Sequence, residues 1–322
     1  MIDEYGRIID YLRISVTDRC NLRCQYCMPA EGVEFIPHDE ILTYDEILTL
    51  GKVFAELGVQ KIKITGGEPL VRKDICSLIG ALKQIEGIKS VTVTTNGVLL
   101  KEHARELSHY GVDGINVSLD TLNRENFKRI TRRDQLDLVL DGIKEAMKYQ
   151  IPVKINCVPL YTSAEEIVEL VQLAKENIHV RFIEVMPIGL GKKKKSYQED
   201  EIKQIIENTY GPLKEVNEKV GNGPCHYYSL EGVGGYIGFI SAMSHKFCES
   251  CNRVRLTSTG FLKTCLQYEL GTDLKALIRA GASEEELKQT ILKTIGLKPQ
   301  AHAFEQETVG NQEMNIMAQI GG

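Results

Sequence analysis

The sequence predicts an α/β fold built on a parallel sheet, followed by a smaller α+β unit. Six short runs rich in β-branched residues recur before residue 190, amphipathic helix-type segments fill the intervals, and this rhythm changes after about Gly191. Such alternation is typical of βαβ units. Six units are fewer than the eight of a closed (β/α)₈ barrel, so a partial barrel and an open sheet both fit the pattern.

The strand-type runs can be placed along the chain in order. They are Tyr11–Val16, Lys61–Thr65, Val91–Thr95, Ile115–Leu119, Val153–Val158 and Val180–Val185. The clearest helix lies at about 44–57, because its apolar residues recur at helical spacing and Thr43 and Glu46 form a capping box before it. A second helix is expected over 136–149 on the same apolar spacing.

The regular alternation of strand-type and helix-type segments stops after about Gly191, which indicates a different unit. We therefore expect domains at 1–190 and 191–322. The lysine run at 192–195 is expected to be a solvated loop rather than a phosphate site. Helices are expected near 199–208, 273–279 and 283–294, the last with a capping box of Ser283 and Glu286. Strand character gathers around Tyr227 and over 236–240 within a glycine-rich stretch.

Composition excludes several classes of protein. The chain has 322 residues, of which 43% are hydrophobic and 26% charged, which is ordinary for a soluble globular protein. Its net charge of −5 argues against a broad basic face for nucleic acid. No apolar stretch approaches the ~20 residues that span a bilayer, and the first ten residues lack a signal peptide. We therefore expect a cytoplasmic protein with neither nucleic acid nor membrane as a partner.

The nine cysteines are the most informative residue type. An odd number in a reducing compartment is a poor disulfide framework, and grouped cysteines there are usually metal ligands or catalytic. Six fall in two groups, which are Cys20, Cys24 and Cys27, and Cys248, Cys251 and Cys265. Of the isolated three, Cys76 and Cys157 are expected in the core and Cys225 in a loop. None of the seven histidines has a metal-binding spacing.

The first group has the spacing C-x3-C-x2-C directly after the first predicted strand, with Tyr26 before its last cysteine. Three thiolates this close can hold three corners of a cubane iron–sulfur cluster, which normally takes four cysteines, and the shortfall leaves one iron open. A zinc site that borrows a fourth ligand is the alternative. Zinc modules favour C-x2-C pairs, so the spacing favours the cluster.

This loop resembles that of the radical S-adenosylmethionine enzymes. The match extends to the turn Gly66-Gly67-Glu68-Pro69 after the second strand, where paired glycines let the backbone approach a ligand. The resemblance implies that S-adenosylmethionine chelates the open iron. It also implies that Tyr26, Gly67, Ser118 and Met186 contact this cofactor.

The second group has the spacing C-x2-C-x13-C. A zinc site with Cys225 or His245 as fourth ligand and an iron–sulfur cluster are about equally compatible with that spacing. Arg253 and Arg255 follow the second cysteine at strand spacing. Because guanidinium groups bind phosphate well, this pair favours a phosphate-bearing ligand beside the thiolates.

The whole pattern resembles the GTP 3′,8-cyclase family of molybdenum cofactor biosynthesis. The matching segments are 6–7, 11–18, 27–29, 116–120, 181–184, 251–257 and 320–322. Two positions depart from the family pattern. Tyr5 stands where Phe is common, and Lys63 stands where Arg is common, which keeps the charge but loses the fork.

This resemblance implies an incomplete (β/α)₆ TIM-like barrel whose C-terminal domain carries a second 4Fe–4S cluster. It implies a lyase that converts GTP to (8S)-3′,8-cyclo-7,8-dihydroguanosine 5′-triphosphate, the first step of molybdopterin biosynthesis, by a radical S-adenosylmethionine mechanism. We expect a homodimer, a reductant as electron donor and cyclic pyranopterin monophosphate synthase as downstream partner.

The resemblance also assigns roles within the active site. The implied GTP contacts are Arg13, Lys63, Thr94, Lys154, Arg253 and Arg255. The implied catalytic residues are Arg13, Arg253, Arg255, Gly321 and Gly322. Two other hypotheses stay open, namely a radical S-adenosylmethionine enzyme acting on a peptide and a zinc-dependent interaction protein without catalysis.

Overall fold

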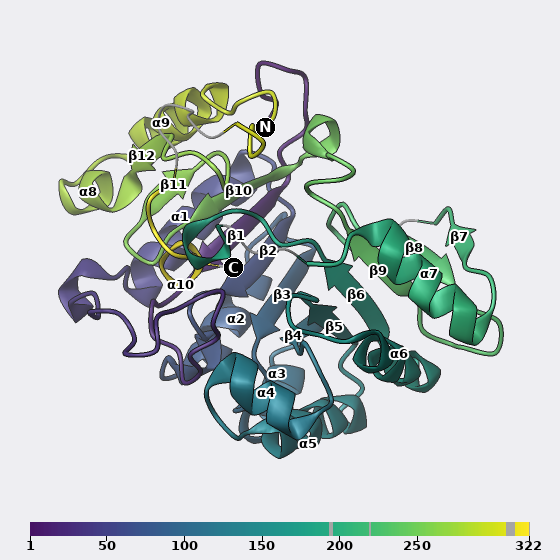
Figure 1. Cartoon of the computed structure of the whole chain (residues 1–322). Coiled ribbons are helices and arrows are strands. Elements are labelled where there is room, and N and C mark those ends of the chain that lie inside the picture. The colour runs from purple at the N-terminus through teal and green to yellow at the C-terminus, as the bar shows by residue number, and fades with distance from the viewer. Residues whose placement is uncertain (193–195, 219, 307–312, 322) are drawn as a thin grey trace.

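The computed structural model describes residues 1–192, 196–218, 220–306 and 313–321. One twelve-stranded sheet runs through this part of the chain, in the order β12-β11-β10-β1-β2-β3-β4-β5-β6-β9-β8-β7 (Figure 1). Of the predicted lysine loop, only the exposed Lys192 is described. Lys193–Lys195 and the terminal Gly322 lie outside the described residues.

The six predicted strand runs form the six central strands, all parallel to their neighbours. They are β1 (Tyr11–Ser15), β2 (Lys61–Thr65), β3 (Ser90–Thr95), β4 (Gly114–Ser118), β5 (Val153–Cys157) and β6 (His179–Ile183). Several end one or two residues before the predicted limit, and at β5 the reason is a change of hydrogen-bond partner. There the Val158 amide donates to the Asp120 carboxylate (2.8 Å).

Residues after 190 extend this same sheet at both of its edges. On one side β10 (Arg253–Leu256) pairs in parallel with β1, and β11 (Phe261–Lys263) and β12 (Gly271–Asp273) follow as antiparallel strands. On the other side β9 (Ile237–Ile240) pairs in parallel with β6, followed by β8 (His226–Ser229) and β7 (Lys214–Val216). The chemistry-bearing cysteines and arginines of the C-terminal third are thereby placed next to β1.

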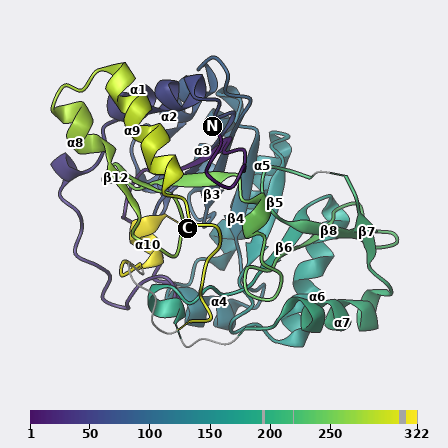
Figure 2. The same cartoon turned by 90° about the horizontal axis from the view of Figure 1, so that it is seen from above.

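Helices cover the outer side of the curved sheet (Figures 1 and 2). They are α1 (Tyr44–Glu56), α2 (Ile75–Lys83), α3 (Leu100–His109), α4 (Arg124–Thr131), α5 (Leu136–Lys148), α6 (Ala164–Gln172), α7 (Glu199–Tyr210), α8 (Leu274–Arg279) and α9 (Glu284–Gly296). The short helix α10 (Met317–Ile320) is not one of them and lies near the strand ends. Both capping boxes predicted from sequence, at α1 and α9, are confirmed. In both views the C-terminal end lies near the middle of the molecule, beside α10.

The apolar core lies between these helices and the strands. Leu12, Ile14, Ile62, Ile64 and Phe54 are among its fully buried side chains. The opposite pleat positions of β1 and β2 carry Arg13 and Lys63. Because successive strand residues face opposite sides, one side of the sheet packs against helices and the other bears charge. None of the described helices is both long enough and apolar enough to cross a bilayer.

Candidate functional site

A cavity of about 510 Å³ lies at the inner face and the carboxyl ends of the parallel strands. Ligand sites of βα folds form at these strand ends. The cavity is lined by every predicted cluster, cofactor and nucleotide residue before position 300, which are Arg13, Cys20, Cys24, Tyr26, Cys27, Lys63, Gly67, Thr94, Ser118, Lys154, Met186, Cys248, Cys251, Arg253, Arg255 and Cys265. The structure therefore brings both cysteine groups, 220 residues apart in sequence, to one chamber.

The first cysteine group is held in a tight loop after β1. The amides of Cys27 and Met28 both donate to the Cys24 carbonyl (3.0 and 2.9 Å). The Cys20 sulfur accepts from the Leu22 amide (3.4 Å) and from the Asn96 side chain (3.7 Å). In the protein chain alone, burial and then the neighbouring Cys20 raise the pKa of Cys27 to about 12. A cationic metal group is what would favour the thiolate form here.

The spacing of the sulfurs bears on which metal group each set of cysteines suits. All six grouped cysteines are described, and in neither group do the three sulfurs all lie within 4.8 Å of one another. Zinc bonded to sulfur at about 2.3 Å in a tetrahedron requires sulfurs about 3.8 Å apart. Neither group therefore has the sulfur arrangement of a single tetrahedral zinc ion. Cys225 and His245 complete no close three-ligand group with the second set either.

The glycine turn after β2 packs directly on the cysteine loop. The Gly67 amide donates to the Thr17 carbonyl and the Glu68 amide to the Arg19 carbonyl, both at 2.7 Å. A Cβ at Gly67 would lie 2.4 Å from the Arg19 carbonyl oxygen. Glycine is therefore required here because the backbone of the cysteine loop approaches closely, whereas the predicted approach to a ligand stays a prediction.

Glu68 is a site residue that sequence reasoning quoted only as part of the turn. Its buried carboxylate accepts from the Leu70 amide (3.0 Å), the Thr95 hydroxyl (2.7 Å) and the Asn96 amide (2.6 Å). Burial raises the pKa of Glu68 to about 7 despite these bonds. The carboxylate lines the chamber beside Cys20, where it suits a cationic ligand group.

Tyr26 is held by a second buried carboxylate. Its hydroxyl donates to Asp120 Oδ2 (2.7 Å), and Asp120 Oδ1 accepts from the Val158 amide (2.8 Å). Burial raises the pKa of Asp120 to about 6. The aromatic ring is thus fixed between the cysteine loop and the end of β4, on the side of the chamber that Ser118 also lines.

The cations form a row across neighbouring strands. In register, Arg13 on β1 lies opposite both Lys63 on β2 and Arg255 on β10. Burial, followed by Arg181, Arg13, Lys154 and Arg253, holds the pKa of Lys63 well below its usual value. Like charges placed opposite one another cost free energy, so this row suits a polyanionic ligand.

Four of the cations that line this part of the chamber have no acidic partner among the described residues. Within the described part of the chain, Lys63, Lys154, Arg253 and Arg255 form no ion pair with a carboxylate. The buried Nε atoms of Arg253 and Arg255 have no hydrogen-bond partner there. Buried polar groups are normally satisfied, so these atoms indicate a missing ligand.

Arg181 on β6 is a cation that sequence reasoning did not assign. It lines the chamber, donates to Asn116 Oδ1 (2.5 Å), and its Nε lacks a partner among the described residues. The available signal was a charged residue at an inward position of a strand-type run, which the alternation of His179–Ile183 shows.

The second cysteine group lies where β10 and β11 approach the N-terminal segment. Arg7 donates to the Cys248 carbonyl (2.9 Å), and the His302 amide lies 3.5 Å from the Cys248 sulfur. Burial alone would raise the pKa of Cys251, but Lys298 and Arg253 outweigh it, and the pKa falls to about 7. The thiolate that metals bind is therefore favoured at Cys251.

Two predicted positions lie at the margin of the chamber. Gly321 is buried against Ser15 and Thr65 at the ends of β1 and β2, but it is not among the residues that line the cavity. Cys225 does line it, and its closest charged neighbours are Arg181 and Lys154 rather than the second cysteine group.

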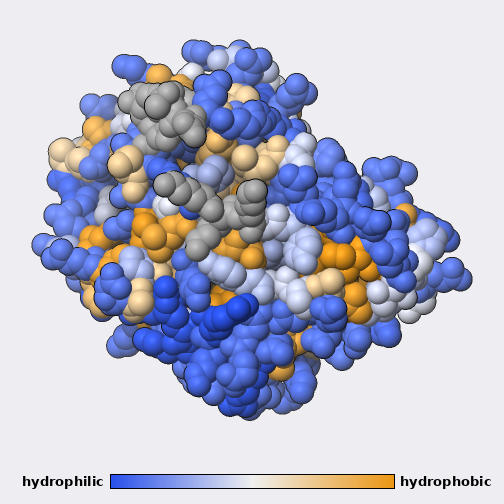
Figure 3. All heavy atoms as spheres, in the orientation of Figure 1, coloured by the Kyte–Doolittle hydropathy of each residue, from blue (hydrophilic) through white to orange (hydrophobic). Residues whose placement is uncertain are grey.

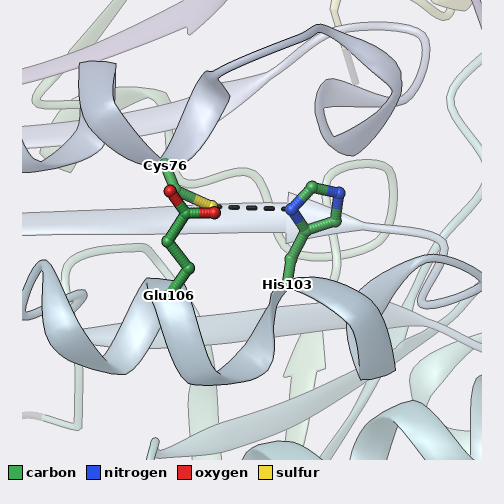
Figure 4. A group of neighbouring side chains, drawn as sticks. All are labelled: Cys76, His103 and Glu106. Atoms are coloured by element: carbon green, nitrogen blue, oxygen red, sulfur yellow. Dashed lines mark hydrogen bonds between the residues drawn. The ribbon is translucent and has the colours of Figure 1, made fainter.

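The remaining cysteines lie outside the chamber. Cys157 and Cys76 are buried, as expected. Cys76 contacts His103 (3.6 Å) and lies beside Glu106, both on α3, a proximity across two helices that sequence spacing does not show (Figure 4). Burial and then Glu106 raise the pKa of Cys76 to about 12. The protonated thiol acts as a hydrogen-bond donor between α2 and α3.

Comparison with known proteins adds two family matches. Residues 14–174 match the family described as the radical SAM superfamily, and residues 178–304 match the family described as Molybdenum Cofactor Synthesis C. The chain is 47% identical over 324 residues to the GTP 3′,8-cyclase of Clostridium perfringens (strain 13) and 48% identical over 328 residues to that of Thermodesulfovibrio yellowstonii. Each alignment covers 100% of both chains.

Solved structures with the same fold are more distant in sequence. Streptococcus suis SuiB bound to S-adenosylmethionine superposes with a TM-score of 0.61 at 20% identity, covering 88% of this chain and 68% of SuiB. SuiB without that ligand gives a TM-score of 0.64 at 17% identity, covering 91% and 67% of the two chains. These likenesses concern the fold alone.

Proposed function

The chain belongs to the GTP 3′,8-cyclases of molybdenum cofactor synthesis, and from that membership we propose that its chamber holds the two reactants at opposite ends. The enzyme is a radical S-adenosylmethionine lyase. It converts GTP to (8S)-3′,8-cyclo-7,8-dihydroguanosine 5′-triphosphate in the first step of the pathway.

S-adenosylmethionine is proposed to bind at the end of the chamber that holds the first cysteine group. Cys20, Cys24 and Cys27 would hold a 4Fe–4S cluster, and with S-adenosylmethionine bound this cluster would supply the radical chemistry of the reaction. The chain's own part is orientation and water exclusion. Tyr26, fixed by Asp120, and Gly67, which admits close backbone approach, support cofactor binding beside this loop. Ser118 and Met186 complete the proposed contact set, and both line the chamber.

GTP is proposed to bind at the cation row. The convergence of these cations is the main observation that supports this substrate site. Triphosphate bears several negative charges, and Arg13, Lys63, Lys154, Arg253 and Arg255 converge on one buried space. Charge-assisted hydrogen bonds from guanidinium groups to phosphate are strong in such surroundings. Thr94, on the neighbouring β3, contributes a hydroxyl to the same wall.

The second cysteine group is proposed to hold a second 4Fe–4S cluster, with the guanine of GTP at its open iron. The lack of a close three-sulfur arrangement among these described cysteines argues against a single zinc ion. The lowered pKa of Cys251 supports metal binding of either kind, because the thiolate is the ligand. Arg253 and Arg255 lie on β10, two and four residues after Cys251, and would bind the triphosphate of this GTP.

The architecture supports two further proposals. Six parallel strands with outer helices resemble an incomplete (β/α)₆ barrel over residues 1–190, and residues 191–322 would form the domain that closes its open side. A homodimer, an external reductant and delivery of product to cyclic pyranopterin monophosphate synthase remain proposals from family membership.

Metal analysis tests this arrangement. After anaerobic reconstitution we expect about eight irons and eight sulfides per chain, since each cysteine group would hold one 4Fe–4S cluster. Calorimetry on the same sample should show GTP binding, whereas unrelated peptides should give no heat. About four irons with one zinc would contradict the second cluster, and binding of a peptide in preference to GTP would contradict the substrate assignment.

A further inference from the structure

The C-terminal segment from Glu313 to Gly321 crosses the molecule to the strand ends. A Cβ at Gly321 would lie 2.7 Å from the Ser15 side chain and 3.3 Å from that of Thr65, and its φ is +87°. Such positive φ favours glycine. Apolar side chains gather across the middle of this face of the molecule, where α10 also lies (Figure 3). Gly321 is therefore buried beside the chamber rather than exposed to solvent.

One buried ion pair fixes the start of this segment. Lys263 on β11 and Glu313 are paired, with side-chain exposures of only 3% and 1%. Lys263 also donates to the Tyr268 carbonyl (2.9 Å), and the Glu313 amide donates to the Gln267 carbonyl (2.7 Å). The second oxygen of Glu313 accepts from the Asn315 amide (2.8 Å), which turns the chain towards α10.

Beyond Met314, apolar contacts attach the segment to the rest of the protein. Ile320 packs with Ile188 and Leu266 in a small buried cluster. The Ile316 Cα would lie 3.0 Å from a Cβ at Gly189, so the segment passes close to the loop after β6. Glu313 is the only charged side chain in the sequence from 313 to 322. Besides this ion pair, the Met314 amide donates to the Glu269 carboxylate (3.3 Å), which is an exposed contact, so the Lys263–Glu313 pair is the buried charged attachment of the described part of the tail.

The position of this pair connects it to the chamber. Lys263 precedes Cys265 by two residues in the sequence. It also lies opposite Arg255 in the antiparallel pairing of β10 with β11. Removing one member of a buried pair leaves an uncompensated charge, which disturbs the structure far more than loss of an exposed pair. The tail's entry point is therefore set by the strand that leads to the second cysteine group.

We propose that Lys263 and Glu313 are positioning residues that hold the C-terminal tail so that Gly321 reaches the ends of β1 and β2. This rests on the proposed function in one respect, namely that the tail takes part in cyclisation of GTP. The pair itself touches neither reactant and acts through the tail.

The first test is the variant Glu313→Gln in the reconstituted holoenzyme. Single-turnover cyclisation of GTP should fall by about 100-fold, the loss that a displacement of about 1 Å can cause, while GTP affinity and iron content stay unchanged. Glu305→Gln is the matched control, because Glu305 pairs with Lys246 at the surface (exposures 57% and 36%). Wild-type cyclisation by Glu313→Gln would overturn the proposal.

A double-mutant cycle shows whether the pair acts through the tail. In a chain lacking residues 321 and 322, Glu313→Gln should change the residual rate by less than about twofold, since coupled residues are not additive. A further loss of tenfold or more would contradict action through the tail. If deletion of the two glycines alone leaves cyclisation intact, the proposed role of the tail fails instead, so the two failures are distinguishable.

A measurement without turnover keeps the proposal testable if Glu313→Gln folds poorly. Trimming of the holoenzyme by a carboxypeptidase, followed by mass spectrometry, reports directly on whether the tail is held. Glu313→Asp keeps the charge but shortens the reach, and it should be trimmed at least fivefold faster than Glu305→Gln and cyclise GTP about tenfold more slowly. If Glu313→Asp and Glu305→Gln are trimmed at equal rates and cyclise GTP at equal rates, the proposal that the Lys263–Glu313 pair holds the tail is refuted.

Discussion

Replacing Lys63 with methionine should make the empty protein more stable and the GTP complex weaker. Lys63 lies on β2 opposite Arg13, and burial together with four nearby cations lowers its pKa well below the usual value. A group whose charged form is disfavoured in this way destabilises the folded chain until an anion arrives. Methionine is unbranched like lysine and replaces its apolar stem almost completely, but it lacks the charged ammonium group.

The two effects can be estimated separately. Relief of an imperfectly paired buried charge in mutational data is about 1 to 3 kcal/mol, so the free energy of unfolding without GTP should rise by about that amount. A hydrogen bond to a charged partner contributes about 1.5 to 3 kcal/mol, so the dissociation constant for GTP should rise roughly ten- to 100-fold. GTP should therefore stabilise the variant much less than it stabilises the wild type.

Lys61→Met on the same strand is the matched control. Lys61 pairs with Asp10 (2.7 Å) and is not among the residues that line the chamber. Its loss should lower the free energy of unfolding slightly and leave GTP affinity unchanged. Anaerobic urea unfolding and calorimetry, each with and without GTP, measure both quantities. If Lys63→Met lowers stability, or binds GTP as tightly as wild type, the reasoning about the cation row is wrong.

Other perturbations separate the two ends of the chamber and test its pH dependence. Cys24→Ala should abolish S-adenosylmethionine cleavage, whereas Cys265→Ala should mainly impair GTP binding and cyclisation; equal loss of cleavage in both folded variants would contradict separate roles. Burial, then Lys154 and Arg181, lowers the pKa of His179 to about 4. The unfolded chain therefore binds more protons between about pH 6.5 and 4, so the free energy of unfolding should fall by about 1 kcal/mol from pH 7.5 to 5.5. His179→Asn, which keeps an acceptor for the Tyr236 amide, should remove that loss in urea titrations, and an unchanged pH profile would refute it.

Local patterns in the sequence predicted much of the fold. The six central strands, the capped ends of α1 and α9 and the burial of Cys76 and Cys157 were all accessible, because each depends on spacing or burial tendency within a few residues. The placement of β10 beside β1 was not, since it pairs residues about 240 positions apart. That pairing is what aligns Arg255 with Arg13.

The parts of the site that sequence reasoning missed depend on contacts between distant segments. Arg181 lines the same chamber as the cation row because β6, like β1 and β2, faces that chamber. Glu68 gains its raised pKa from burial under the cysteine loop, which composition does not show. The anchoring of the tail depends on the burial of Glu313 against Lys263, although sequence alone makes Glu313 an ordinary surface-type residue.

Product analysis of a single turnover tests the central claim most directly, namely that one chamber serves both reactants. Anaerobically reconstituted protein is mixed with GTP, S-adenosylmethionine and a strong reductant, and the nucleotides are identified by mass spectrometry and nuclear magnetic resonance. We expect close to one 3′,8-cyclised nucleotide for each S-adenosylmethionine cleaved. Cleavage of S-adenosylmethionine with recovery of unaltered GTP from protein that contains both clusters would contradict the account.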